Sequence, residues 1–154
     1  MLKKMNPDEI SVSIRKMRLD DIDDIKRIYE LITKKDLPED FGELVENPRE
    51  KLTLEPNCFV AEFEGKVVGF MISFVMAFTF GMGKKAWIAS MGVEPKYMGK
   101  QIGARLAREI FEFYKAQGVT NLYTAVQWDA TDLVSFFKTL GFHRSDFINL
   151  EKSL

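Results

Sequence analysis

Short stretches that alternate apolar and polar residues recur along the chain and predict β-strands. The segment SVSIRKMR (11–18) has this alternation, and NCFVAEFEGKVVGFMISFVM (57–76) has it twice, on either side of Glu64-Gly65. A short break that contains Gly between two such runs is typical of a β-hairpin. Three further strands are predicted at 85–95, 121–128 and 142–154.

A second pattern, with apolar residues three or four positions apart, predicts helices between these strands. One helix covers 20–32, where isoleucines share one face and aspartates crowd the first turn, which the helix dipole favours. Another runs from Ile102 to about Gln117 and is ended by Gly118.

Two further helices are predicted from their end signals. The segment 129–140 is expected to begin with Asp129 as the N-cap and Asp132 as the acid of a capping box. The segment 38–48 predicts a short helix that is ended by Pro48.

The predicted order of elements is β-α-α-β-β-β-α-β-α-β, within a single domain that covers residues 1–154. An antiparallel hairpin region followed by a strand–helix–strand unit predicts a mixed, mostly antiparallel central sheet with helices on both faces. The fold class is therefore α/β of the α+β type.

Composition and charge exclude several classes of function. The net charge of −1 lacks the basic excess of a nucleic-acid-binding protein. One cysteine and one histidine make a structural zinc site improbable. The longest apolar run, 67–80, is too short to span a membrane, and the N-terminus has no apolar signal region. We expect a cytoplasmic protein that binds neither membrane nor nucleic acid.

The stretch KYMGKQIGARLAREI (96–110) places two glycines, Gly99 and Gly103, where a helix is about to begin. A helix N-terminus that follows a strand and a glycine loop is suited to bind an anion, because its first N–H groups point outward. Lys100 adds positive charge. The alternative is that Gly99 serves only the turn and Gly103 only helix packing. The stretch matches neither a dinucleotide-binding fingerprint nor a P-loop.

The segment MGVEPKYMGKQIGARLAREIFEFYKAQGVTNLYTAV, followed by DATDLVSFFKTLGF, resembles the GCN5-related N-acetyltransferases. The resemblance implies an acyl-CoA N-acyltransferase fold that binds acetyl-CoA between a fourth and a fifth strand that diverge. The pantetheine arm would pair with Met91, Gly92 and Val93. The pyrophosphate would bind the backbone N–H groups of Met98, Gly99, Lys100, Gln101, Ile102, Gly103 and Ala104.

The chain departs from the family pattern at several positions. Gln101 stands where the family prefers Gly, so we expect it to adopt a conformation that is open to any L-residue. Phe137 stands where the family often has the tyrosine that protonates the leaving thiolate, and we expect its ring near the cofactor sulfur. Ala125 stands where related N-terminal protein acetyltransferases have a glutamate base.

Acetyl transfer from a thioester requires a neutral amine, stabilisation of the carbonyl oxygen and departure of the thiolate. Backbone N–H groups near Gly92 and Val93 could stabilise the oxygen. Glu94 is the candidate general base, acting through a water, although a solvated carboxylate at the edge of the sheet is the simpler explanation. Tyr123, on the predicted fifth strand, is the candidate general acid.

These features predict an N-acetyltransferase that moves an acetyl group from acetyl-CoA to a primary amine by direct attack in a ternary complex. The acceptor would be a small molecule or a protein amine, and a homodimer is compatible with the sequence. Two alternatives remain open. One is a non-catalytic acyl-CoA-binding or regulatory domain, and the other is an anion-binding α/β domain unrelated to CoA.

Overall fold

The fold is built around one five-stranded sheet with the spatial order β1-β2-β3-β4-β5. It is seen in a computed structural model that describes residues 10–37, 54–76, 80–81 and 83–154. The strands are β1 (Ser13–Lys16), β2 (Leu54–Phe63), β3 (Lys66–Met76), β4 (Lys85–Val93) and β5 (Leu122–Thr124). The first four pair antiparallel, and β5 pairs parallel to β4. The predicted mixed, mostly antiparallel sheet is confirmed.

The hairpin between β2 and β3 turns at the two residues that the sequence indicates. Glu64 and Gly65 both have positive φ, of 49° and 76°. A two-residue turn with both φ angles positive matches the right-handed twist of the flanking strands. This long hairpin forms the centre of the sheet, with β1 and β4 on its two sides.

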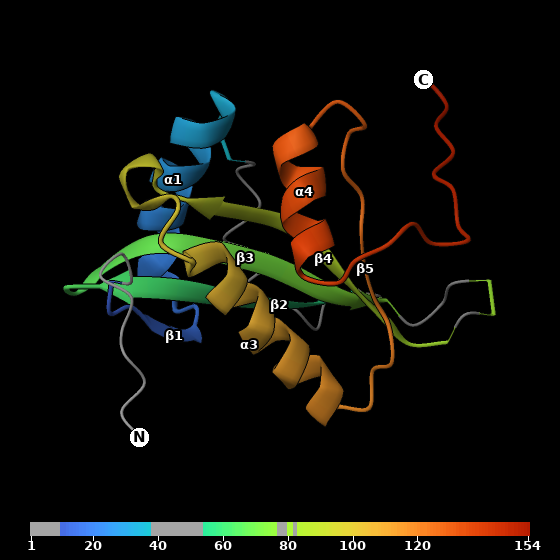
Figure 1. Cartoon of the computed structure of the whole chain (residues 1–154), viewed down its shortest axis with the longest axis horizontal. Coiled ribbons are helices and arrows are strands. Elements are labelled where there is room, and N and C mark those ends of the chain that lie inside the picture. Colours follow the sequence, from blue (N-terminus) through green and yellow to red (C-terminus); the bar gives the residue numbers. More distant parts are fainter. Residues whose placement is uncertain (1–9, 38–53, 77–79, 82) are drawn as a thin grey trace.

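Helices lie on both faces of the sheet, as predicted (Figure 1). One face is covered by α1 (Ile22–Thr33), which follows a short 3-10 turn, η1 (Leu19–Asp21). The other face is covered by α3 (Ile102–Ala116), which follows a second such turn, η2 (Pro95–Tyr97), and by α4 (Thr131–Thr139).

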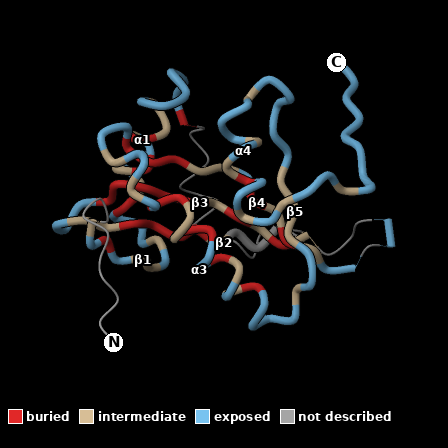
Figure 2. Tube along the Cα trace, viewed as in Figure 1, coloured by how far each residue is buried: buried red, intermediate tan, exposed pale blue. Residues whose placement is uncertain are grey.

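Two apolar cores result from this layering, one on each face of the sheet. Figure 2 shows runs of buried residues along the strands that lie between them. The smaller core lies under α1 and contains Ile25, Ile28, Leu37, Val60, Val67 and Phe70. The larger core lies under α3 and α4, with Leu106 and Ile110 fully buried at its centre. The apolar stripes read from the sequence therefore face the sheet.

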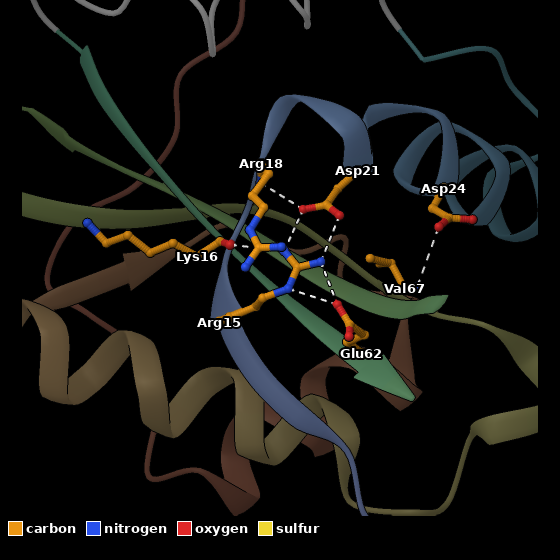
Figure 3. Close-up of polar contacts among 7 residues, drawn as sticks. All are labelled: Arg15, Lys16, Arg18, Asp21, Asp24, Glu62 and Val67. Atoms are coloured by element: carbon orange, nitrogen blue, oxygen red, sulfur yellow. Dashed lines mark hydrogen bonds and ion pairs between the residues drawn. The ribbon is translucent and has the colours of Figure 1, made fainter. Parts of the chain in front are cut away.

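A partly buried polar contact joins β1 and β2 to the turn before α1 (Figure 3). The Arg15 guanidinium donates to both carboxylate oxygens of Asp21, at 2.7 and 2.9 Å, and also to Glu62 at 2.7 Å. Asp21 accepts a third hydrogen bond from the Arg18 amide. These bonds, with the hydrogen bond from Arg15 first among them, hold the pKa of Asp21 below its ordinary value.

Replacing Asp21 by Asn is expected to destabilise the protein by about 2–3 kcal/mol at pH 7, because Asp21 is buried and bonds a charged partner. A carboxyl whose folded pKa is lowered stabilises the protein above its unfolded pKa, and this stability is lost as pH falls through the folded pKa. The difference in free energy of unfolding between the parent protein and the variant, measured with urea, should therefore narrow below about pH 4.

The control is Asp23→Asn, the same substitution at an exposed position in the first turn of α1. It should cost less than about 1 kcal/mol, the usual limit for a charge near a helix end. Equal effects of the two variants would contradict a special role for the Arg15–Asp21 pair.

Two local predictions at the C-terminal end are wrong. Ala130 is the N-cap of α4, and its methyl side chain cannot accept a capping bond. Asp129 lies one residue earlier, in a backbone turn in which its carbonyl accepts from the Thr131 amide. Residues 142–154 form no strand, since Phe142 is held in the core by Phe111 and Phe137 and the rest of the segment lacks a pairing partner. The helix predicted at 38–48 lies outside the described residues.

Among the described residues, no helix is long and apolar enough to cross a membrane.

Candidate functional site

A bulge in β4 marks the point where this strand leaves β5. Ile72 pairs with Ser90 whereas Ser73 pairs with Ile88, so Ala89 is the extra residue of a β-bulge. The pairing of β4 with β5 ends at Ile88, so within the described residues Ala89–Val93 have no strand partner on that side. Bulges bend and twist a strand and are frequent beside active sites. The end of the ladder agrees with the divergence of strands expected from the family resemblance.

The N-terminus of α3 is suited to binding an anion. The first hydrogen bond of this helix runs from the Arg105 amide to the Gln101 carbonyl at 3.0 Å, so the three preceding amides have no acceptor within the helix. No side chain in the described part of the chain caps this end, and its first turn carries no acidic residue. By contrast, α1 carries Asp23 and Asp24 in its first turn. The free amides and the helix dipole of α3 therefore favour a negatively charged group.

The loop before α3 contains two residues in the left-handed region. Gly99 has φ 77° and Gln101 has φ 63°. The expectation that Gln101 adopts a conformation open to any L-residue is wrong, because this region costs an ordinary residue about 1–2 kcal/mol. The same angle explains the family's preference for Gly at this position, and strained residues of this kind cluster at functional sites.

The missing side chain of Gly103 is explained by packing. Gly103 is buried, and a Cβ built on it would lie 3.2 Å from Met91 Cε and 3.2 Å from the Phe136 ring. This favours the packing alternative for Gly103 and sets the first turn of α3 close against β4 and α4. Ile102 is likewise buried, and its Cγ2 would lie 3.0 Å from a Cβ on Gly69 in β3.

The end of β4 offers mainly its main chain to a ligand. Val93 is buried in the larger core. Residues on the face of the sheet that α1 covers exclude a side chain at Gly92, because a Cβ there would lie 2.8 Å from Phe70 and 2.9 Å from Ile32. The predicted pairing of an extended ligand with Met91, Gly92 and Val93 would therefore use backbone groups, as β-strand addition does.

The other predicted loop residues, which lie between η2 and the first turn of α3, differ in exposure. Met98 is 53% exposed, Gly99 and Gln101 are exposed, and Lys100 and Ala104 are half-buried. Their contact with a cofactor stays a prediction.

Glu94, the predicted general base, lies directly after β4 and is held by two cations. Its Oε2 accepts from Arg27 of α1 at 3.0 Å, and its Oε1 lies 3.3 Å from the Lys96 ammonium. Desolvation acts to raise the pKa of Glu94, but the hydrogen bonds from Arg27 and Lys96 outweigh it and place the pKa below its ordinary value. A carboxylate with a lowered pKa is a weak base. The geometry suits Glu94 to holding α1 against the end of β4.

Tyr123, the predicted general acid, lies on β5 opposite Trp87 of β4 and stacks on it with ring centroids 5.0 Å apart. Phe147 from the C-terminal segment packs edge-on against Tyr123 at 5.9 Å. The indole Nε1 of Trp87 is buried and has no hydrogen-bond partner in the described part of the chain. A buried N–H without a partner is rare and is a feature of sites that receive a ligand or water.

Phe137 and Tyr114 are core residues. Phe137 is 5% exposed and packs edge-on against Phe136 and Phe142. Its proximity to a cofactor sulfur stays a prediction. The Tyr114 hydroxyl shares a 2.8 Å hydrogen bond with the buried Ser73, which explains it as part of the packing.

The sequence reasoning missed Arg27, Trp87 and the bulge at Ala89. The signal for the bulge was present in KAWIASMGV, since the buried Ile88 and the next residue on its face, Met91, are three positions apart instead of two. Arg27 and Trp87 carried no comparable signal, because an arginine on a helix and a tryptophan in a strand are ordinary.

The comparisons with known proteins identify the family of the chain. The model of the acetyltransferase (GNAT) family matches residues 22–142. The chain belongs to this family. No curated protein sequence gives a match.

Solved structures of acetyltransferases share the fold of this GNAT chain. A possible acetyltransferase from Clostridium difficile 630 is 20% identical, with a TM-score of 0.74 over 93% of this chain and 97% of that one. The aminoglycoside acetyltransferase meta-AAC0020, from an uncultured soil metagenomic sample, is 18% identical, with a TM-score of 0.75 over 93% and 96%. The ribosomal-protein-alanine N-acetyltransferase from Brucella melitensis biovar Abortus 2308 is 16% identical, with a TM-score of 0.73 over 94% and 99%.

Proposed function

We propose that this GNAT chain transfers an acetyl group from acetyl-CoA to a primary amine, with both substrates bound at once. One observation carries the proposal. The uncapped, acid-free N-terminus of α3 lies against the part of β4 that has no β5 partner, so an anion site adjoins an open strand edge. A ligand with phosphates at one end and an amide-bearing arm at the other fits both features.

Some residues of the chain would bind acetyl-CoA, and others would position it. Amides of Ile102, Gly103 and Ala104 would bind the phosphates, and the main chain of Met91–Val93 would align the extended arm. N–H groups near Gly92 and Val93 would stabilise negative charge on the carbonyl oxygen. Gly103 and Gly92 contribute indirectly, because their missing side chains let α3 and α1 approach β4.

Acetyl-CoA supplies an activated thioester. The neutral amine nitrogen would form a bond to the carbonyl carbon, the carbon–sulfur bond would break with its electron pair on sulfur, and the amine proton would pass to water. We propose Tyr123 as the group that protonates the thiolate, because it lies on β5 where the ladder with β4 ends. A thiolate leaves readily near neutral pH, so this proton transfer assists without being required.

The acceptor is proposed to be a small-molecule or protein amine that approaches the Trp87–Tyr123 pair. An aromatic face attracts cationic groups. The solved relatives include an aminoglycoside acetyltransferase and a ribosomal-protein-alanine N-acetyltransferase, so a test panel should contain both kinds of amine.

The deciding experiment measures release of free thiol from acetyl-CoA with a panel of polyamines, aminoglycosides and peptides with free N-termini. Amine-dependent thiol release is expected. Binding of acetyl-CoA without turnover on any amine would favour the non-catalytic alternative. A protein that binds neither acetyl-CoA nor CoA would be an anion-binding domain of another kind, and the proposal would fall.

Replacing Glu94 by Gln is expected to weaken the attachment of α1, because Glu94 forms ion pairs with Arg27 and Lys96. The pH dependence of kcat/KM should be unchanged, because a carboxylate held in these pairs does not act as the base. The matched variant is Arg27→Met, which removes the other partner. Since both residues act as one pair, the double variant should be little less stable than either single one. The measurements are urea unfolding and pH–rate profiles of the three variants.

A loss of about 10²–10⁴-fold in kcat for Glu94→Gln, with Arg27→Met far more active, would instead identify Glu94 as a general base. In that case the acidic limb of the pH profile should move upward in Arg27→Met, because removing the cation raises the pKa of the carboxyl.

A further inference from the structure

The parallel ladder between β4 and β5 is short, and side chains reinforce it (Figure 1). In the described part of the chain it consists of three pairs: Ala86 with Leu122, Trp87 with Tyr123 and Ile88 with Thr124. At its beginning, the Lys85 ammonium donates to the Thr120 hydroxyl at 3.2 Å and to the Asn121 side chain at 2.9 Å. At the middle pair the two aromatic rings stack. Three pairs share few main-chain hydrogen bonds, so these side-chain contacts contribute a large part of the attachment of β5.

The last pair of this ladder carries a side-chain hydrogen bond of its own. The Thr124 hydroxyl donates to the Ile88 carbonyl at 3.0 Å, from one strand to the other and in a partly buried position. Directly after this pair β5 ends, and β4 has its bulge at Ala89. The hydroxyl therefore joins the two strands at the last point before they separate.

The position of this hydrogen bond decides which residues of β4 stay open. A short ladder can open locally at its end, because few contacts hold it there. If Ile88 and Thr124 separated, Trp87 would become the last paired residue of β4, and the segment after it would lose its anchor. The main chain of Met91–Val93, on this open segment, is the part that would align the extended arm of acetyl-CoA. Its alignment depends on where the ladder ends.

We propose that Thr124 is a positioning residue that fixes the point where β4 and β5 separate and thereby aligns the open segment of β4 with the pantetheine arm of acetyl-CoA. The alignment of the arm rests on the proposed function, whereas the end of the ladder does not. Threonine suits this position, because its branched side chain favours a strand and its hydroxyl supplies the donor. Valine has nearly the same shape without the donor, so Thr124→Val tests the hydroxyl alone.

The first test measures amide hydrogen exchange in the protein without ligand. In Thr124→Val, residues 87–89 and 123–125 should exchange about two- to tenfold faster than in the parent, which is the factor that one net hydrogen bond supplies. Thr124→Ser keeps the hydroxyl and should exchange like the parent. The matched control, Thr120→Val, removes a hydroxyl at the other end of the same ladder and should leave both segments unchanged. Unchanged exchange in Thr124→Val would overturn the proposal.

The second test compares two probes by calorimetry, CoA and 3′-phospho-ADP, which is CoA without its pantetheine arm. Thr124→Val should bind CoA about two- to tenfold more weakly than the parent. It should bind 3′-phospho-ADP like the parent, because the phosphates use the amides of α3 and not the open segment of β4. Thr124→Ser and Thr120→Val should bind both probes like the parent.

The outcomes separate the role of Thr124 from the proposed function. An equal loss of affinity for both probes would indicate a general disturbance, and an unchanged affinity for CoA would show that the hydroxyl does not align the arm. Either result would overturn the proposal while acetyl-CoA binding by the parent stands. If the parent binds neither probe, the proposed function and the alignment of the arm both fall. The exchange measurement then still decides whether Thr124 fixes the end of the ladder.

Discussion

The Gln101→Glu variant is expected to lose more than half of the thermal stabilisation that CoA or acetyl-CoA gives the parent protein. Gln101 is exposed and precedes the three amides that have no acceptor within α3. The substitution keeps the size of the side chain and adds one negative charge where phosphate is expected. Repulsion between like charges a few ångströms apart costs several kcal/mol near a protein surface before salt screening.

The expected loss of ligand-induced stabilisation is large enough to measure as a change in Tm. A ligand at about a hundred times its Kd stabilises a protein by about 2.7 kcal/mol. At roughly 2–4 °C per kcal/mol for a domain of this size, the parent Tm should rise by several degrees. Without ligand, the variant should be as stable as the parent or more stable, because the helix dipole favours an acid at this end by about 0.3–1 kcal/mol.

The matched control is Gln117→Glu, the same substitution at the opposite end of the same helix. It should keep the full ligand-induced rise in Tm, and it should be slightly less stable without ligand, because an acid is unfavourable at a helix C-terminus. Equal ligand-induced shifts in both variants would place the cofactor away from α3. Absence of a shift in the parent protein would contradict acetyl-CoA binding altogether.

The parts of the fold that the sequence predicts are those that local pattern determines. The hairpin at Glu64-Gly65 and the helix from Ile102 follow from alternation, apolar period and turn residues, and the structure has them. The predicted final strand fails for the opposite reason. Alternation shows that residues 148–151 suit a strand, but it cannot show whether one chain offers them a partner.

The same distinction between local pattern and tertiary contact applies to the candidate site. Motif spacing located the loop between η2 and α3 without any knowledge of packing. The reasons for individual residues came only from tertiary contacts. Gly103 is small because Met91 and Phe136 lie beside it, and Glu94 is engaged by an arginine 67 positions away in the chain. Such pairings between distant segments leave no mark in a single sequence.

Gly92→Val is expected to destabilise the protein by about 3 kcal/mol, although valine is the better strand residue by local propensity. A Cβ at this position would lie 2.8 Å from Phe70 Cε1 and 3.1 Å from Ile28 Cγ2, and both of these side chains are fully buried. The Phe70 ring therefore has little room to move aside. The measurement is urea unfolding, and the control is Ala89→Val, at an exposed position on the same strand that should change stability little.

A second substitution tests the cause of this loss. Phe70→Leu alone should destabilise the protein, because it removes buried ring atoms and leaves a cavity. In the Gly92→Val background the same change removes the atom that the new side chain meets, so it should cost less or restore stability. The favourable coupling should fall within about 0.5–3 kcal/mol. Additive effects would mean that Ile28 and Ile32 of α1, and not the Phe70 ring, exclude a side chain at Gly92.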